Sequence, residues 1–297
     1  NTYQGEQLTF GPEYLIPKPF DPRLIMEIPP GVALAAAKSG VAMRPIQDLD
    51  AYRDDLSRFV FRSGMLMKPM FEAARATKLR LVLAEGEGGK MLQACQLIVS
   101  ENLADVTLVG RRKVIEEKIQ SMSLSIQAGK DFQIVDNLDD AVITPIGEEY
   151  HALMARQGMT PKAAQTRVRA NTTVVASMLL RRGDADAMLC GTFGTYGKHL
   201  RLAEEIIGRR DGSPVVGAMT VLILPQGTIF LTDTHVNFDP TAEHLCELGK
   251  LAADEIRRFG IQPKAAFLSH SNFGSSDTTS AKKVREATTM FMDRYSN

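Results

Sequence analysis

The feature that most constrains the fold is the alternation of short apolar runs with helical segments in the first half of the chain. Residues 79–84 read as a strand, and a glycine-rich turn and a predicted helix over 90–102 follow. Strands are predicted at 106–109 and 132–135, with a helix at 114–120 between them. Strand–helix alternation of this kind predicts an α/β fold whose mostly parallel sheet carries helices on both faces.

The second half of the chain begins with a long predicted helical region over 141–182. The second half of that region starts at Thr160, which can cap a helix, and Pro161, which fits a first helical turn. Residues 187–190 then resume the strand pattern. Residues 217–224 and 228–232 are apolar runs joined by a short linker, which predicts a β-hairpin. Two more helices are predicted, one capped by Asp239-Pro240 and ending near Phe259, the other over 280–295.

Length and charge bound the possible functions. The 297 residues exceed the usual size of one domain and suggest two. The 35 basic and 35 acidic residues balance, whereas a surface for nucleic acid or anionic membrane needs a basic excess. No apolar stretch approaches the roughly 20 residues of a membrane span. We therefore expect no nucleic-acid partner and no membrane.

The cysteines and histidines indicate the compartment and argue against a metal site. Cys95, Cys190 and Cys246 are isolated in apolar surroundings, which predicts reduced, buried thiols in a cytoplasmic protein rather than a catalytic cysteine. The chain has no signal-peptide pattern. Its five histidines lack metal-ligand spacing, so no metal site is predicted in this chain.

A polar loop follows a predicted buried strand near the C-terminus. Apolar residues at 265–268 give way to hydroxyl groups, an amide and a glycine over 269–276, with no charged side chain between 265 and 276. Such a loop suits holding an acyl or phosphate group, because hydroxyl and amide groups donate hydrogen bonds and glycine lets backbone N–H groups approach. The alternative is a serine-rich surface turn.

A second candidate loop follows the strand at 187–190. Its glycines, at 191, 194 and 197, precede a helix, where backbone N–H groups can bind an anion beyond the carboxyl end of the strand. Asn237 is a third candidate, although a turn residue that caps its own backbone is as good a reading. The turn at 85–90 lacks the glycine that G-x-G-x-x-G requires at Met91, so we favour a tight structural turn there.

A serine hydrolase is a weak interpretation. His270 lies between Ser269 and Ser271, but adjacent strand residues point to opposite faces, so His270 cannot readily serve its neighbours. The chain also has no G-x-S-x-G sequence.

Several motifs, in order, resemble the phosphate acetyltransferase/butyryltransferase family from about Met65 to the end. They lie at 156–160, 183–188, 230–237, 240–241, 268–271 and 284–288. The opening, at 14–24, 39–42 and 44–46, is similar to the junction in bacterial multidomain NADP-dependent malic enzymes, upstream of a C-terminal acetyltransferase-like domain. With the start at Asn1, this resemblance predicts a fragment of a longer protein.

The resemblance implies two α/β/α lobes with mostly parallel sheets and a cleft between them. Residues 1–44 would be a linker and remnant of the upstream NAD(P)-binding domain, here with a helix over 32–38. Residues 45–145 plus 285–297 would form the first lobe, and residues 146–284 the second. It also implies a homodimer, a higher oligomer in the full-length protein, and upstream malic enzyme domains as partners, which alone would hold NADP and a divalent metal.

The function implied is an acetyl-CoA-binding regulatory domain of a malic enzyme, with acetyl-CoA or CoA as its ligand and without acetyltransferase activity. Phe273 stands where active relatives often carry a basic or small polar residue, and no residue is assigned as catalytic. The alternatives are an active phosphate acetyl/butyryltransferase, with its cation and base from Lys198, Arg167 or Asp277, and an oligomerisation module that binds nothing. The residues expected to bind the ligand are Thr192, Phe193, Lys198, Asn237, Ser269, Ser271, Asn272, Phe273, Gly274 and Ser275.

Overall fold

The computed structural model describes residues 22–224, 226–272 and 274–295, which fall into two compact units. The smaller unit takes in Asn1–Glu72 (described from residue 22), Thr220–Leu231 and Glu255–Pro263. The larger unit takes in Ala73–Met219, Thr232–Asp254 and Lys264–Asn297. The lobe boundaries expected from the sequence stay a prediction, and residues 1–21 of the expected upstream remnant lie outside the described residues.

The smaller unit contains helix α1 (Pro22–Lys38), most of helix α2 (Leu49–Thr77), and strands β5 (Met219–Leu224) and β6 (Gly227–Thr232). The helix predicted over 32–38 is confirmed and begins earlier, at Pro22. Asp48 starts α2, because its Oδ1 accepts the N–H groups of Asp50 and Ala51 at 3.0 and 2.9 Å. β5 and β6 pair in a two-stranded sheet, so the predicted hairpin is confirmed.

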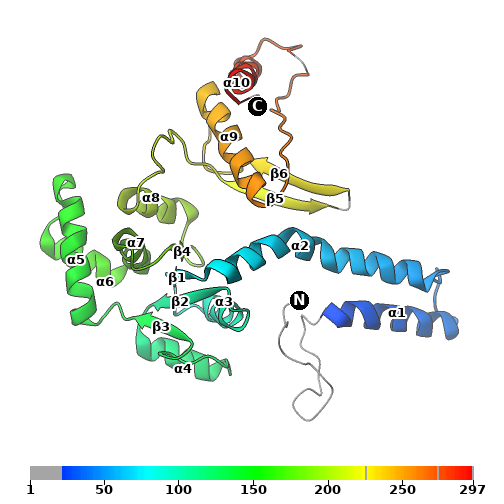
Figure 1. Cartoon of the computed structure of the whole chain (residues 1–297), viewed down its shortest axis with the longest axis horizontal. Helices are drawn as coiled ribbons and strands as arrows, with labels where there is room; N and C mark the ends of the chain where they lie inside the picture. The colour runs from blue at the N-terminus through cyan, green and yellow to red at the C-terminus, as the bar shows by residue number, and fades with distance from the viewer. Residues whose placement is uncertain (1–21, 225, 273, 296–297) are drawn as a thin grey trace. The chain divides into compact units, whose positions relative to one another are not determined.

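The larger unit is built on a four-stranded sheet in which every pair of neighbouring strands is parallel (Figure 1). Its order is β3-β2-β1-β4, and helices α3 (Gly89–Ser100) and α4 (Arg112–Ser121) connect the first three strands in sequence. This arrangement confirms the predicted α/β class. The strands are β1 (Leu79–Leu83), β2 (Ala104–Val109), β3 (Phe132–Val135) and β4 (Ala187–Leu189).

Helices cover both faces of this sheet, because alternate residues of β1 enter different cores. Val82 packs with side chains of the helices that follow β3, in one cluster. Leu83 packs with side chains of α3, α4 and β3 in the other. Strands buried on both faces are the condition under which a parallel sheet is stable. The continuous apolar run at 79–84 is therefore explained by the central position of β1, between β2 and β4.

The helical region predicted over 141–182 is confirmed, including the start of its second half at Thr160 and Pro161, and the structure adds a further break at Asn171. Gly158 stops the first part in the left-handed conformation, at φ +84°. Thr160 restarts a helix by accepting the N–H of Ala163 at 3.2 Å, and Asn171 restarts it again by accepting the N–H of Thr173 at 3.0 Å. The elements are α5 (Asp140–Met154), a 3-10 turn (Ala155–Gln157), α6 (Pro161–Ala170) and α7 (Thr172–Arg182).

The remaining helices are α8 (Tyr196–Ile206), α9 (Ala242–Arg258) and α10 (Thr279–Tyr295). Thr241, and not Asp239, caps α9, since its Oγ1 accepts the N–H of His244 at 3.2 Å. The buried strand predicted at 265–268 is also wrong, because no strand is assigned there, the segment pairs with no strand among the described residues, and Leu268 is 80% exposed. Phe267 packs instead on Phe291 of α10, with ring centroids 5.3 Å apart.

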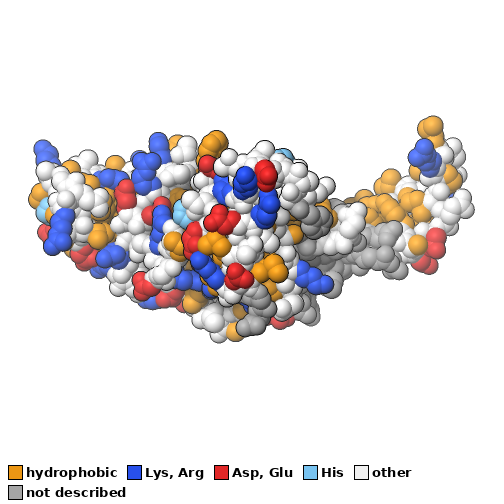
Figure 2. Space-filling view, turned by 90° about the horizontal axis from the view of Figure 1, so that it is seen from above, with side chains coloured by type: hydrophobic (Ala, Val, Ile, Leu, Met, Phe, Trp, Pro, Cys, Tyr) orange, Lys and Arg blue, Asp and Glu red, His pale blue; other side chains and the backbone are white. Residues whose placement is uncertain are grey.

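Basic and acidic side chains are interspersed on the face of the molecule in Figure 2. Within the described ranges, no helix is both long and apolar enough to span a membrane, and no three metal-binding side chains gather. Cys95 and Cys246 are buried free thiols and Cys190 is partly buried. Burial raises the pKa of Cys95 to about 12, which keeps it protonated and unreactive at neutral pH.

We expect Gly86→Ala to destabilise the larger unit by about 1–3 kcal/mol, the usual range for overpacking. A Cβ atom there would lie 2.9 Å from both the Cβ of Leu108 and the carbonyl oxygen of Val109, neither of which is free to move. Gly197→Ala is the matched control, because a Cβ there meets nothing within 4 Å and alanine favours helix α8. Urea unfolding measures both, and equal stability of the two variants would contradict the expectation.

Candidate functional site

The second predicted loop, here residues 191–195, lies at a topological switch point of the sheet. From β1 the chain runs outward through β2 and β3 and then returns to add β4 on the other side of β1. In open α/β sheets, ligands bind outside the carboxyl ends of the strands at such a point. We call residues 191–195 the glycine loop; it joins β4 to α8 and faces the residues that follow β1.

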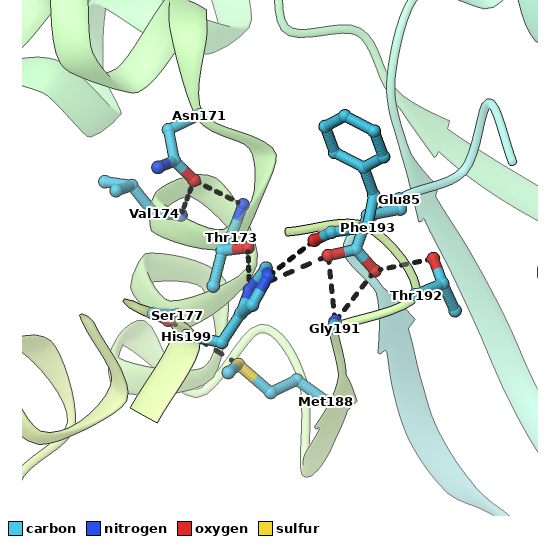
Figure 3. Close-up of polar contacts among 10 residues, drawn as sticks. All are labelled: Glu85, Asn171, Thr173, Val174, Ser177, Met188, Gly191, Thr192, Phe193 and His199. Carbon is cyan, nitrogen blue, oxygen red and sulfur yellow. Dashed lines mark hydrogen bonds and ion pairs between the residues drawn. The ribbon is translucent and has the colours of Figure 1, made fainter. Parts of the chain in front are cut away.

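The carboxylate of Glu85 holds the start of the glycine loop (Figure 3). The N–H of Gly191 donates to Oε1 and Oε2 of Glu85 at 3.0 and 3.2 Å. The hydroxyl of Thr192 donates to Oε2 at 3.3 Å. The Glu85 side chain is only 13% exposed. The backbone donor expected to bind a ligand's anion is therefore taken by a carboxylate of the chain itself.

His199 of α8 holds the other part of the loop. Its Nε2 lies 2.7 Å from the carbonyl oxygen of Phe193, and because a carbonyl only accepts, Nε2 carries the proton. Its Nδ1 lies 3.0 Å from Oγ1 of Thr173 and 3.8 Å from Oε1 of Glu85. At Gly194 a Cβ atom would come within 3.0 Å of Nε2, and φ is +98°. Glycine is the residue that fits there.

Thr173, His199 and Glu85 do not form a catalytic triad. In a triad the histidine uses one ring nitrogen for the nucleophile and the other for the carboxylate. Here Thr173 and Glu85 both lie beside Nδ1, while Nε2 is bonded to the backbone. Thr173 is also only 2% exposed. The cluster therefore positions the loop and does not activate a nucleophile.

The structure leaves the predicted ligand-binding side chains of this loop accessible. Thr192 and Lys198 are exposed, and Phe193 is 84% exposed. Arg167, one alternative cation for a transferase, pairs with Glu205 at 3.6 Å and lies 5.9 Å above the Tyr150 ring. Arg167 thus belongs to the packing of α5, α6 and α8.

The turn at 85–90 is a structural turn, as favoured from the sequence. The N–H of Gly88 closes it on the carbonyl oxygen of Glu85 at 2.9 Å. The two oxygens of Glu87 bind the Arg111 side chain at 2.8 and 2.7 Å. The Arg111 guanidinium lowers the pKa of Glu87 against the effect of burial. This second carboxylate therefore joins the β1 and β2 loops.

Asn237 has the geometry of the alternative reading, a turn residue bonded to its own backbone region. Its side-chain amide donates to Val216 O at 2.8 Å and to Oδ2 of Asp233 at 2.6 Å. Oδ1 of Asp233 accepts the N–H of Ala218 at 2.9 Å, and Oδ2 accepts the N–H of Asn237 at 2.6 Å. Both amide protons of Asn237 are used, which leaves only its side-chain oxygen for a ligand.

The serine loop, residues 269–276, is exposed over most of its length. The hydroxyl of Ser271 lies 3.3 Å from that of Ser275 and accepts the N–H of Ser276 at 3.1 Å. The hydroxyl of Ser269 donates to the carbonyl oxygen of Ser271 at 3.0 Å. Asn272 is exposed. Phe273, another predicted ligand-binding residue, lies outside the described residues.

A cation that the sequence analysis missed lies against the serine loop. A Cβ atom at Gly274, which has φ +78°, would lie 3.2 Å from Nη1 of Arg285. Nη2 of Arg285 donates to the carbonyl oxygen of Ser276 at 3.2 Å and lies 3.4 Å from Oδ1 of Asp277. Arg285 lies in the family-like motif at 284–288. It belongs to helix α10, which follows the loop, so the residues at 265–276 carry no signal of its presence.

Two links join the candidate segments. Tyr196, next to the glycine loop, packs edge-on against His235 of the Asp233–Asn237 turn, with ring centroids 4.5 Å apart. Lys283 of α10 pairs with Asp239, just after that turn. Among the described residues, no hydrogen bond or ion pair joins the glycine loop to the serine loop directly.

The chain belongs to the phosphate acetyl/butaryl transferase family, whose model matches residues 65–297. A phosphate acetyltransferase of Clostridium acetobutylicum is 31% identical over 75% of this chain and 68% of its own length. The phosphotransacetylase of Streptococcus pyogenes superposes with a TM-score of 0.70 at 23% identity, covering 80% of this chain and 70% of that one. The predicted phosphate acetyltransferase-like fold is confirmed.

Higher identity is found with malic enzymes. An NADP-dependent malic enzyme of Haemophilus influenzae is 52% identical over 99% of this chain and 39% of its own length. That of Escherichia coli is 48% identical over the same shares. The chain thus spans well under half the length of these relatives. The predicted resemblance to the acetyltransferase-like part of malic enzymes is confirmed.

We expect Asp233→Asn to cost about 1–3 kcal/mol of stability at neutral pH, because the amide NH₂ must face N–H donors. Burial alone would raise the pKa of Asp233, but hydrogen bonds from Ala218 and Asn237 outweigh it and hold the pKa at about 2. The carboxylate's contribution is therefore complete above its unfolded pKa of about 3.9 and is lost as the pH falls toward about 2.

Urea unfolding between about pH 7 and pH 3 measures this effect, and the gap between parent and variant should narrow only below about pH 4. Asp239→Asn is the control, since that carboxylate lies on the surface with Lys283 as its partner. A gap that stays constant down to about pH 3 would show that Asp233 is not the group involved.

Proposed function

We propose that this chain is an acetyl-CoA-binding regulatory domain of an NADP-dependent malic enzyme, without phosphate acetyltransferase activity. NADP and a divalent metal would bind only in upstream domains, which would be its covalent partners. The chain would form a homodimer, and the full-length protein a higher oligomer in the cytoplasm. The observation that carries the proposal is the serine loop, which combines neutral donors with one guanidinium group.

The donors of the serine loop suit the parts of an acyl-CoA. The hydroxyls of Ser271 and Ser275 and the amide of Asn272 can donate to a thioester carbonyl. Arg285 lies beside Gly274, and a guanidinium group pairs well with phosphate. Lys198 supplies a second exposed cation at the glycine loop. The residues present therefore fit acetyl-CoA.

The lack of turnover is supported by how the charged groups near the loop are used. Acetyl transfer needs a group that accepts the proton of the CoA thiol, because the thiolate is the nucleophile. Both ring nitrogens of His270 are near hydroxyl groups, Thr278 at 3.2 Å and Ser280 at 3.5 Å. Asp277 pairs with Arg285. A bound acetyl group would then be held and not consumed.

The pair of Asp277 and Arg285 also favours the alternative function, an active phosphate acetyl/butyryltransferase. With acetyl phosphate as the acyl donor, Asp277 would take the proton of the CoA thiol and the sulfur would bond to the acyl carbon. The bond from that carbon to the phosphate oxygen would break, and phosphate would leave with its charge held by Arg285; the reverse reaction follows the same steps backwards. An assay of acetyl phosphate formation from acetyl-CoA and phosphate separates the two proposals. Turnover near about 10 per second, typical of enzymes, that Asp277→Asn abolishes would establish the alternative.

We expect calorimetry to detect binding of acetyl-CoA to the chain, and Asn272→Ala to weaken it by about 1–3 kcal/mol, as for unpairing a polar group. Gln93→Ala on α3 is the matched control, because Gln93 is another exposed amide outside the candidate loops. If the parent chain binds neither acetyl-CoA nor CoA, the proposed function fails. If Asn272→Ala binds like the parent, Asn272 is not in the site.

Regulation is tested in the full-length enzyme. Acetyl-CoA should change the rate of malate oxidation, and Asn272→Ala should reduce that response while basal malate oxidation survives. Thermodynamic linkage adds a second measurement, since malate or NADP must alter the affinity for acetyl-CoA by the factor by which acetyl-CoA alters theirs. An enzyme that binds acetyl-CoA without either effect would contradict the regulatory role.

A further inference from the structure

The glycine loop is held at its start and its middle by two side chains, Glu85 and His199, that are not among the predicted ligand-binding residues. Glu85 binds its first two residues, through the N–H of Gly191 and the hydroxyl of Thr192. His199 binds its middle, through the carbonyl oxygen of Phe193. Together they bind three consecutive loop residues, the same stretch that carries two predicted ligand-binding side chains, Thr192 and Phe193 (Figure 3).

The anchors are themselves fixed. Glu85 follows the central strand β1, and its side chain is 13% exposed. His199 is bonded through Nδ1 to Thr173, whose own N–H is bonded to Asn171 at the start of α7 at 3.0 Å. A chain of hydrogen bonds, partly buried up to His199, therefore runs from α7 to the loop. A loop held by packed elements keeps its geometry better than one that orders on binding.

We propose that Glu85 is a positioning residue, which holds the glycine loop so that Thr192 and Phe193 face acetyl-CoA. This inference rests on the proposed function, since it concerns the same ligand. Glu85 does not touch the ligand and carries no step of a reaction. It acts through Gly191 and Thr192, and His199 assists it from α8. One oxygen of the carboxylate, Oε2, accepts from two donors of the loop at once, and its negative charge strengthens both hydrogen bonds.

Glu85→Gln tests the role with little change of shape. The amide is neutral, so the hydrogen bonds from Gly191 and Thr192 lose their charge assistance, and its NH₂ group replaces one of the two oxygens that share the N–H of Gly191. We expect hydrogen exchange of the Gly191 amide to accelerate by about 10-fold or more, because its hydrogen bond then opens locally. We expect the dissociation constant for acetyl-CoA to rise by about 10-fold, because part of the binding free energy must then order the loop.

Glu87→Gln is the matched control. Glu87 lies two residues away in the same turn and holds a different loop, through the N–H and guanidinium of Arg111 at 2.9, 2.8 and 2.7 Å. This variant should accelerate exchange at the Arg111 amide and leave Gly191 and acetyl-CoA binding within about 2-fold of the parent. Glycine- and arginine-selective ¹⁵N labelling reports the two amides separately. If each variant accelerates exchange only at its own partner amide, the effect of Glu85 on acetyl-CoA binding is one of positioning and not of a general loss of stability.

Three results would overturn the proposal: unchanged exchange at Gly191 in Glu85→Gln, faster exchange with parental affinity for acetyl-CoA, or equal loss of affinity in Glu87→Gln. Should Glu85→Gln fail to fold, Glu85→Asp takes its place, since it keeps the charge but withdraws the carboxylate by one methylene group. Failure of the proposed function is recognised separately, because the parent chain then does not bind acetyl-CoA, and the positioning role falls with it.

Discussion

The pairing of β1 with β4 is the interaction on which the rest of the larger unit depends. It is fastened at both ends by a carboxylate. At the amino end, Asp186 binds the side chain of Arg80 at 3.0 and 2.6 Å and also its N–H at 2.9 Å. At the carboxyl end, Glu85 binds Gly191. Both contacts join residues 106 positions apart. A slip by one residue would break both, so the register is well specified.

The sequence predicts the sheet well and the later part of the chain less well, for a physical reason. β1, β2 and β3 lie within short strand–helix units, where local patterning and neighbours in space coincide. The run at 265–268 is as apolar as the strands of the sheet, but it forms no strand, and Phe267 packs on α10 instead. The helix start at Thr160 and Pro161 was predicted from the residues themselves, and the start at Asn171, which was not predicted, carries a similar local signal in its capping amide.

The candidate site divides in the same way. Hydroxyl and glycine patterns suggested both loops as ligand-binding loops, but only the glycine loop follows a strand, β4, in the described residues. The sequence pattern did not predict that Glu85 and Arg285 contact the two loops, because their partners, Gly191 and Gly274, lie in other segments of the chain. Asn237 shows the converse. Its residue type suggested either a ligand contact or a turn residue, and in the structure its amide group donates a hydrogen bond to the carboxylate of Asp233.

The distance along the chain between β1 and β4 also dictates an order of assembly. Leu79 pairs with Ala104 in β2, whereas Leu81 pairs with Ala187 in β4. Closing a loop about four times longer costs about 1 kcal/mol more entropy, so we expect β4 to dock last. Until then Glu85 remains hydrated and the glycine loop unformed. Substitutions that weaken β4 docking would therefore deplete the binding-competent state while β1, β2 and β3 stay folded.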